Sequence, residues 1–167
     1  MKESLLFPCS KQGRWEKGYV NRETNEFVIA PKYFSAQHFK DGLAAVKLEY
    51  NGKWGVINEE DRLIIPFKYD DIKYYSESLM AAKLNNNWGF IDCLDKIIIP
   101  FKYEFASWFS EGLAPVQLNG WYGYINKSDE VVIGFQYNWA APFENGFGEV
   151  ELQGNRFSVD KIGNKWF

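Results

Sequence analysis

The chain has 167 residues, enough for one domain with a core of its own, and carries a formal net charge of −3 at pH 7. This charge argues against a nucleic-acid-binding protein, because such proteins usually display a cluster or stripe of Lys and Arg that this sequence lacks. No apolar stretch approaches the roughly 20 residues of a membrane-spanning helix, and the run Leu5–Phe7 is too short for a secretion signal. We therefore expect a cytoplasmic protein that contacts neither nucleic acid nor membrane.

Three short motifs recur in a fixed order along the chain. An acidic or small pair precedes a short strand, as in Asp41-Gly42-Leu43, and an aromatic-glycine-aliphatic strand follows, as in Trp88–Asp92. The third motif is an apolar strand ending in Pro-x-Lys-Tyr, as in Ile98–Tyr103. The glycine of the second motif recurs at positions 18, 55, 89 and 123, with Ser158 in its place in a worn last copy, so the spacings are 37, 34, 34 and 35 residues.

This period is typical of a repeat protein. It predicts a single repeat domain, 1–167, with four full units and one truncated unit. Their approximate bounds are 3–40, 41–76, 77–110, 111–144 and 145–167.

The first strand of each unit alternates apolar and other residues, as at Ala44, Val46 and Leu48. It ends in residues that tolerate positive φ and suit a two-residue hairpin turn. These turn residues are Asn51-Gly52, Asn85–Asn87, Asn119-Gly120 and Gly154-Asn155. The first and second strands are therefore predicted to pair antiparallel.

The second strand ends in Asn or Asp, and a residue suited to the left-handed backbone region follows three positions later. These residues are Asp61, Asp95, Asp129 and Gly163. The third strand is expected to stop at Pro31, Pro66 or Pro100, because proline has no N–H to donate to a ladder and so marks a strand end or an edge. In the loop that follows, residues such as Tyr103, Ala106 and Phe109 recur at intervals of three, which predicts one turn of helix.

A lone hairpin is marginally stable in water, so such units must stack to bury their apolar faces. The predicted fold is all-β, a tandem array of three-stranded antiparallel β-meander repeats. The stack forms either an open β-solenoid or a closed, propeller-like ring. We favour the open array, because the sequence contains no signal for closure.

The sequence offers little material for catalysis. His38 is the only histidine, and its loop position carries Tyr74, Trp108 and Pro142 in the other units, so we expect it to be exposed. A metal site needs three or four clustered ligands, and one histidine with two distant cysteines does not supply them. Phosphate-binding and dinucleotide-binding motifs are missing as well. We expect no enzymatic activity, no cofactor and no metal.

Two alternatives remain open. The acidic runs Glu59–Asp61 and Asp70-Asp71 would suit an enzyme with paired carboxylates, such as a glycoside hydrolase, although solvated charge is normal in such turns and loops. The recurrent Trp54 and Trp88 would suit a carbohydrate-binding module whose aromatic rows stack on sugars. We favour a structural role for them, as buried rings beside glycines that another backbone or ring approaches closely.

The connecting loops vary most between units, as a specific binding surface requires. Their large or acidic residues are the candidates for partner binding: Phe34, Asp70, Asp71, Tyr74, Glu104, Phe105, Trp108 and Trp139. Exposed aromatic residues beside acids are typical anchors at protein interfaces. Because arrays tend to place variable loops on one face, we expect these residues to form one patch. The short, polar hairpin turns should offer little apolar area.

The strings Trp88–Asp92 and Ile98–Tyr103, with Phe109–Ala114 between copies, resemble the WG-repeat family. These repeats are also called KWG repeats, and Lys53–Gly55 matches that form. The resemblance covers nearly the whole chain. Two departures from the family pattern are Tyr122 in place of the tryptophan and Gly134 in place of the proline.

The resemblance implies a bacterial binding module, and some such proteins resemble immunity proteins that neutralise a toxin. We therefore expect a non-catalytic protein-binding module, with an immunity or inhibitor protein that covers a toxin or effector as the specific hypothesis. The acidic balance would suit a basic partner, because opposite charge speeds encounter.

Overall fold

The structure, a computed structural model, describes residues 4–166; the outermost residues of the expected domain, 1–3 and 167, lie outside this range. Over the described residues the fold is all-β, with five small antiparallel sheets and no helix. The predicted class, a tandem array of antiparallel β repeats, is confirmed.

Each sheet contains three main strands in chain order. The first strands are β1 (Leu6–Ser10), β5 (Leu43–Lys47), β9 (Met80–Leu84), β13 (Ala114–Leu118) and β17 (Gly148–Leu152). The second strands are β2 (Lys17–Asn21), β6 (Trp54–Asn58), β10 (Asn87–Ile91), β14 (Trp121–Ile125) and β18 (Asn155–Val159). The third strands are β3 (Phe27–Tyr33), β7 (Leu63–Tyr69), β11 (Ile97–Tyr103), β15 (Val131–Tyr137) and β19 (Lys165–Trp166).

Four of the sheets carry an additional short strand, and here the predicted helical turn is wrong. These strands are β4 (Ser35–Ala36), β8 (Asp71–Ile72), β12 (Phe105–Ala106) and β16 (Trp139–Ala140). Each pairs with the first strand of the next unit, as Ile72 does with Ala82. The pairing continues past β8, since the Lys73 N–H donates to the Ala81 carbonyl at 2.8 Å. An extended loop thus satisfies its backbone on the sheet edge, which a single helical turn could not do.

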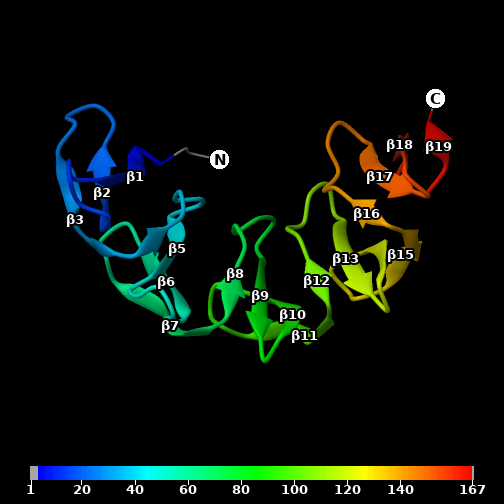
Figure 1. Ribbon diagram of the computed structural model, residues 1–167, viewed down its shortest axis with the longest axis horizontal. Helices are drawn as coiled ribbons and strands as arrows, with labels where there is room; N and C mark the ends of the chain where they lie inside the picture. The colour runs from blue at the N-terminus through cyan, green and yellow to red at the C-terminus, as the bar shows by residue number, and fades with distance from the viewer. Residues whose placement is uncertain (1–3, 167) are drawn as a thin grey trace.

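The five sheets follow one another along an open arc (Figure 1). The sheet of β1–β3 lies at one end and the sheet of β16–β19 at the other, and the two do not meet. The short strands β8 and β12 lie on the concave side, whereas the third strands β7, β11 and β15 lie on the convex side. The array is therefore the open solenoid that the sequence favoured rather than a closed ring.

The core lies between successive sheets rather than within any one unit. Between the second and third sheets, Val56, Ile65 and Tyr69 of one sheet pack with Met80 and Ile91 of the next. These five side chains are at most 1% exposed. Equivalent clusters fill the other three interfaces. Each of the three inner sheets thus buries both faces against neighbours, and each end sheet buries one, which explains why the fold needs a stack of units.

The third strands β3, β7 and β11 run on through their prolines to the following tyrosine, so the prediction that they stop at proline is wrong, whereas the edge position that proline also indicates is confirmed. In the second sheet Trp54 pairs with Tyr69 and Val56 with Ile65, which leaves residues 66–68 bulged opposite the single residue Gly55. The third strand is the outer edge of its sheet. A bulge on an edge strand tolerates a missing N–H, because that position has no ladder partner to serve.

The bulge explains why the glycine of the Trp-Gly motif recurs. A Cβ added at Gly55 would lie 2.8 Å from the Ile65 carbonyl oxygen and 3.0 Å from the Phe67 ring. At Gly89 and Gly123 the carbonyl oxygen of the bulged strand would be 2.6 Å away. The predicted close approach of another backbone or ring to these glycines is confirmed.

The hairpin turns between first and second strands are of two sizes. Two-residue turns with positive φ at both positions occur at Asn85-Asn86 and Asn119-Gly120, as predicted, and at Gln153-Gly154, one residue earlier than predicted. In the second sheet the expected turn at Asn51-Gly52 is replaced by a six-residue loop, because Lys47 pairs with Trp54.

The last sheet corrects the alignment of the worn fifth copy. Strand β18 pairs with β17 so that Arg156 takes the place of the motif tryptophan and Phe157 the place of the glycine, 34 residues after Gly123. Ser158 is therefore one residue beyond the glycine position. A large side chain is tolerated here because β19 pairs only through Lys165 and Trp166 in the described chain, without a bulge over residue 157.

Candidate functional site

Three loops, two of which follow the concave strands β8 and β12, contribute side chains to one groove, which we call the concave groove (Figure 1). His38, Tyr74 and Trp108 occupy the same position in successive units, two residues beyond the short strand. They line a groove of about 340 Å³ together with Phe39, Lys40 and Ser76. The rings of Tyr74 and Trp108 meet edge to face, with their centroids 6.1 Å apart.

The groove combines exposed rings with a buried support. Tyr74 is 42% exposed and Trp108 is 36% exposed, whereas Phe39 is 7% exposed and forms part of the core. The loops are tied to one another, because the buried Ser76 hydroxyl donates to the Phe109 carbonyl at 2.7 Å. The exposed rings are therefore presented by a backbone that is already ordered. His38 is exposed, as predicted, and stands beside Tyr74 at the groove.

The other predicted aromatic of the third loop, Phe105, has a different environment. Its half-buried ring lies 5.8 Å from Trp88 and 5.8 Å from Tyr122, and the Lys73 ammonium lies 5.9 Å from it. It thus seals the edge of the interface between the third and fourth sheets. Phe105 and Trp108 are three residues apart, yet only Trp108 lines the concave groove.

The remaining predicted residues lie near the hairpin ends of the sheets. Phe34 packs between Trp15 and Tyr50, and Trp139 lies under the Arg156 guanidinium at 4.8 Å. The three acids have local partners. Asp70 pairs with Lys53 and Asp71 with Lys73, while Glu104 accepts a hydrogen bond from the Gly120 N–H.

The eight predicted residues therefore divide between two locations instead of forming the single patch that we expected. Tyr74 and Trp108 line the concave groove, and the other six follow the hairpin ends. The residues separate because the short strand in each loop sets the direction in which every side chain points. The sequence pattern gave no sign of this strand.

Polar contacts between sheets recur along the array, and the sequence reading missed them. Lys68 and the Tyr69 hydroxyl both contact the carboxylate of Asp95 in the next unit, the hydroxyl at 2.6 Å. Burial, followed by the hydrogen bond to Asp95, raises the pKa of the Tyr69 phenol. The same contact joins Lys32 and Tyr33 to Asp61, and Lys102 and Tyr103 to Asp129. These contacts could have been inferred from the sequence, because the Lys-Tyr pair and the turn Asp both recur along the chain.

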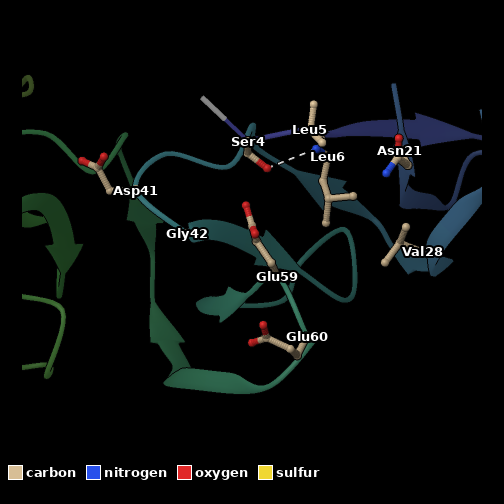
Figure 2. Close-up of a pocket in the computed structure, with 9 residues that line it drawn as sticks. All are labelled: Ser4, Leu5, Leu6, Asn21, Val28, Asp41, Gly42, Glu59 and Glu60. Carbon is tan, nitrogen blue, oxygen red and sulfur yellow. Dashed lines mark hydrogen bonds between the residues drawn. The ribbon is translucent and has the colours of Figure 1, made fainter. Parts of the chain in front are cut away.

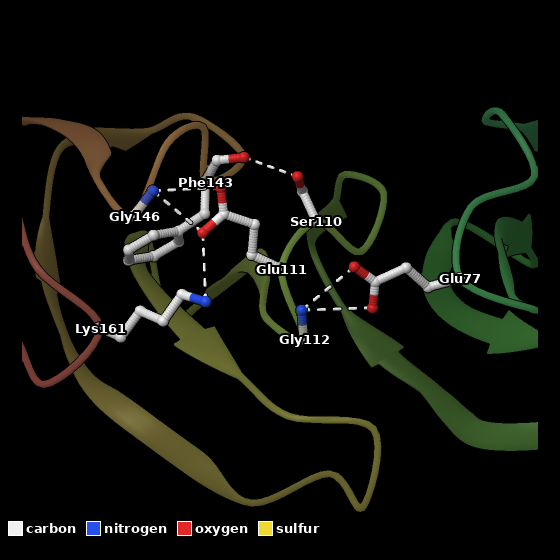
Figure 3. A network of polar contacts seen from close by, with 7 residues as sticks. All are labelled: Glu77, Ser110, Glu111, Gly112, Phe143, Gly146 and Lys161. Carbon is white, nitrogen blue, oxygen red and sulfur yellow. Dashed lines mark hydrogen bonds and ion pairs between the residues drawn. The ribbon is translucent and has the colours of Figure 1, made fainter.

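A second set of contacts joins the starts of successive units (Figure 3). Both carboxylate oxygens of Glu111 accept from the Gly146 N–H, at 3.1 and 3.0 Å, and the Lys161 ammonium lies 3.1 Å away. Glu77 makes the same contacts to the Gly112 N–H and to Lys127. These carboxylates hold the left-handed turns at the unit boundaries in place.

Replacing Glu111 by Gln should make stability less sensitive to acid. The Gly146 N–H, and after it Lys161, lower the pKa of the Glu111 carboxyl below its ordinary value of 4.5. A carboxyl with a lowered folded-state pKa stabilises the fold above its unfolded pKa, and this contribution is lost as pH falls through the folded value. Denaturant titrations of both proteins should therefore differ at neutral pH and converge below pH 4.5. A difference that persists unchanged at acid pH would show that the charge of Glu111 is irrelevant.

A larger hollow lies between the first two sheets (Figure 2). It measures about 630 Å³ and contains the acidic pair that the sequence raised as a carboxylate site, Glu59 and Glu60, in the turn after β6. The full lining is Ser4, Leu5, Leu6, Asn21, Val28, Asp41, Gly42, Glu59 and Glu60. The side of the first sheet thus contributes both apolar and polar side chains, and the side of the second sheet contributes three carboxylates.

Residues 4–166 contain no group of three or more His, Cys, Asp or Glu side chains that could hold a metal ion. Cys9 and Cys93 are both free thiols. No helix in this part of the chain is long and apolar enough to cross a membrane.

Comparison with known families decides the relationship of the chain. A sequence model described as "WG containing repeat" matches it four times, over residues 18–54, 54–88, 88–120 and 122–156. The chain belongs to the WG-repeat family. No curated protein matches it significantly. The WG-repeat matches span all five sheets in part, from β2 to the start of β18, and include the concave loops with Tyr74 and Trp108.

Proposed function

We propose that this WG-repeat chain is a non-catalytic protein-binding module that holds its partner in the concave groove. The observation that carries the proposal is the Tyr74–Trp108 ring pair. Each of the two side chains is more than one third exposed, and both belong to loops with an ordered backbone. The concave surface of a solenoid is the usual binding surface of such arrays.

The groove has the properties of an interface anchor. Rigid aromatic side chains supply large contact area at a low entropic cost, and Tyr and Trp are enriched among interface residues with large binding energies. The loop position that holds them carries His38, Tyr74, Trp108 and Pro142 in successive units, so this face does not repeat. A non-repeating surface suits recognition of one specific partner.

The more specific form of the proposal is an immunity or inhibitor protein of the bacterial cytoplasm that covers a toxin or effector. The net charge of −3 supports a basic partner, because opposite net charges steer the two proteins together. Inhibition by covering requires no catalytic group on this chain.

Trp108→Ala should weaken partner binding by about 2 kcal/mol or more, the size of an interface hot spot. The partner is first isolated from the native host with the wild-type chain and identified by mass spectrometry. Calorimetric titration of that partner then compares wild type with the variant, and a thermal melt of each shows whether the fold survives.

Trp121→Ala provides the matched control, because Trp121 is 44% exposed but belongs to a hairpin end rather than to the groove. We expect it to bind the partner like wild type. The proposal fails if Trp108→Ala binds with unchanged affinity, or if its melt collapses, because the tryptophan is then either irrelevant to binding or a core residue. Binding of sugars in place of a protein, lost in the same variant, would support the carbohydrate alternative instead.

A further inference from the structure

Two neighbouring hairpin loops are larger than the others in the array. The loops 11–16 in the first sheet and 48–53 in the second have six residues each, whereas the next three sheets use two-residue turns. Both loops are irregular insertions relative to the repeat. In repeat proteins such insertions collect on one face, which is often a binding face.

Each enlarged loop presents an exposed aromatic ring, contrary to our expectation that hairpin turns offer little apolar area. Trp15 is 59% exposed and Tyr50 is 73% exposed. Phe34 joins the two loops, because its ring centroid lies 5.5 Å from that of Trp15 and 5.4 Å from that of Tyr50. We name Trp15, Phe34 and Tyr50 the hairpin cluster.

The side chain of Lys47 packs against the hairpin cluster. The Lys47 ammonium lies 5.6 Å from the ring centroids of both Phe34 and Trp54, and it donates to the Tyr50 carbonyl at 2.8 Å. The Gly52 N–H closes the same loop by donating to the Glu49 carbonyl at 3.0 Å. The loop that carries Tyr50 is therefore held in shape before any ligand arrives.

The charge around the hairpin cluster is opposite to that of the whole chain. The segments 11–17 and 47–53 contain five basic residues (Lys11, Arg14, Lys17, Lys47 and Lys53) and two acidic ones (Glu16 and Glu49), and Asp70, the ion-pair partner of Lys53, adds a third acid. Their formal charge is therefore 5 − 3 = +2, in a protein whose net charge is −3. Such local inversion of charge favours an anionic ligand.

We propose that the hairpin cluster is a second binding surface, which takes an acidic segment of a protein with an apolar or aromatic side chain seated on the three rings. Carboxylates of that segment would be met by the surrounding Lys and Arg side chains. A single-stranded nucleic acid is disfavoured, because neighbouring rings are tilted by 52° and 84° and form no parallel platform for successive bases. This surface is separate from the concave groove and does not depend on it.

Selection from a randomised peptide library displayed on phage tests the proposal with the full chain as bait. We expect the enriched peptides to be rich in Asp and Glu around one aromatic or large apolar residue. The double substitution Trp15→Ala with Tyr50→Ala should weaken the best peptide by about tenfold or more. Because both rings are exposed, a thermal melt should show that this variant remains folded.

Two control variants are compared with the double variant in peptide binding. Trp121→Ala removes an exposed tryptophan from a two-residue hairpin and should bind the peptide like wild type, and so should Trp108→Ala in the groove. The proposal is overturned if acidic peptides are not enriched, or if they bind the double variant equally well. It is also overturned if a single-stranded DNA oligonucleotide binds the wild-type chain and is lost with the double variant, because the ligand class is then nucleic acid.

Discussion

Trp88→Ala is expected to lower the free energy of unfolding by about 3–5 kcal/mol, the range for truncation of large buried aromatics. Trp88 is 4% exposed and belongs to the core between the third and fourth sheets. Its ring also contacts Phe105 and lies 5.2 Å from the Lys73 ammonium. The cavity would open in the middle of the array, where sheets on both sides hold the backbone and limit collapse. A denaturant titration measures the loss.

Trp121→Ala is the matched control for this experiment as well. The two tryptophans are one position apart in equivalent strands, β10 and β14, but Trp121 is 44% exposed. We expect this substitution to change stability by less than about 0.5 kcal/mol. A loss below about 1 kcal/mol for Trp88→Ala would contradict the structural role of the motif tryptophan and leave the ring free for binding.

Gly89→Ala should destabilise the protein by about 2–3 kcal/mol through overpacking. The added Cβ would lie 2.6 Å from the Ile99 carbonyl oxygen and 2.9 Å from the Phe101 nitrogen. Both atoms are backbone, and the pairs Trp88–Tyr103 and Phe90–Ile99 fix the bulge on either side. The strand cannot retreat without breaking pairs that hold the sheet together. Chemical denaturation of the purified variant gives the difference directly.

Gly134→Ala separates this effect from the general cost of replacing glycine. Gly134 is exposed on the convex strand β15, and a Cβ there would meet no atom within 4 Å. Its substitution should leave stability within about 0.5 kcal/mol of wild type. Equal losses for both variants would mean that the close approach at Gly89 is not the reason for the recurrent glycine.

The sequence sufficed for the parts of the fold that follow from local chemistry. Period-two alternation indicated the strands, and the Asn and Asp turn residues indicated the left-handed positions, where Asp61, Asp95 and Asp129 have φ of 62°, 66° and 65°. These features depend on residues close in the chain. The recurring motif then fixed the number of units.

The parts that escaped prediction depend on contacts between units. A two-residue strand such as Asp71-Ile72 is too short to show a period, so the fourth strand was read as a helical turn. The six-residue loop at 48–53 contains Asn51-Gly52, a strong signal for a two-residue turn, and only the pairing of Lys47 with Trp54 reveals its true length. The exposed Tyr50 was missed for the same reason.

The candidate site was predicted in part. Variation between units indicated the loop that carries Tyr74 and Trp108, and the structure brings these two rings together on the concave side. Variation between units could not show that Trp108 lines the groove and Phe105 does not, because both positions carry large residues here and differ between units. The side that each ring faces is set by the pairing of Phe105 with Gln117, which is a contact between distant residues.

Photo-cross-linking from the groove tests the central proposal most directly. A photoreactive amino acid replaces Tyr74 on the concave side or, as a control, Ile98 on the convex strand β11, and each chain is irradiated in extract of the native host. We predict one cross-linked protein from position 74, suppressed by excess wild-type chain but not by excess Trp108→Ala, and no such product from position 98. Equal labelling from position 98, or none from position 74, would contradict binding in the concave groove.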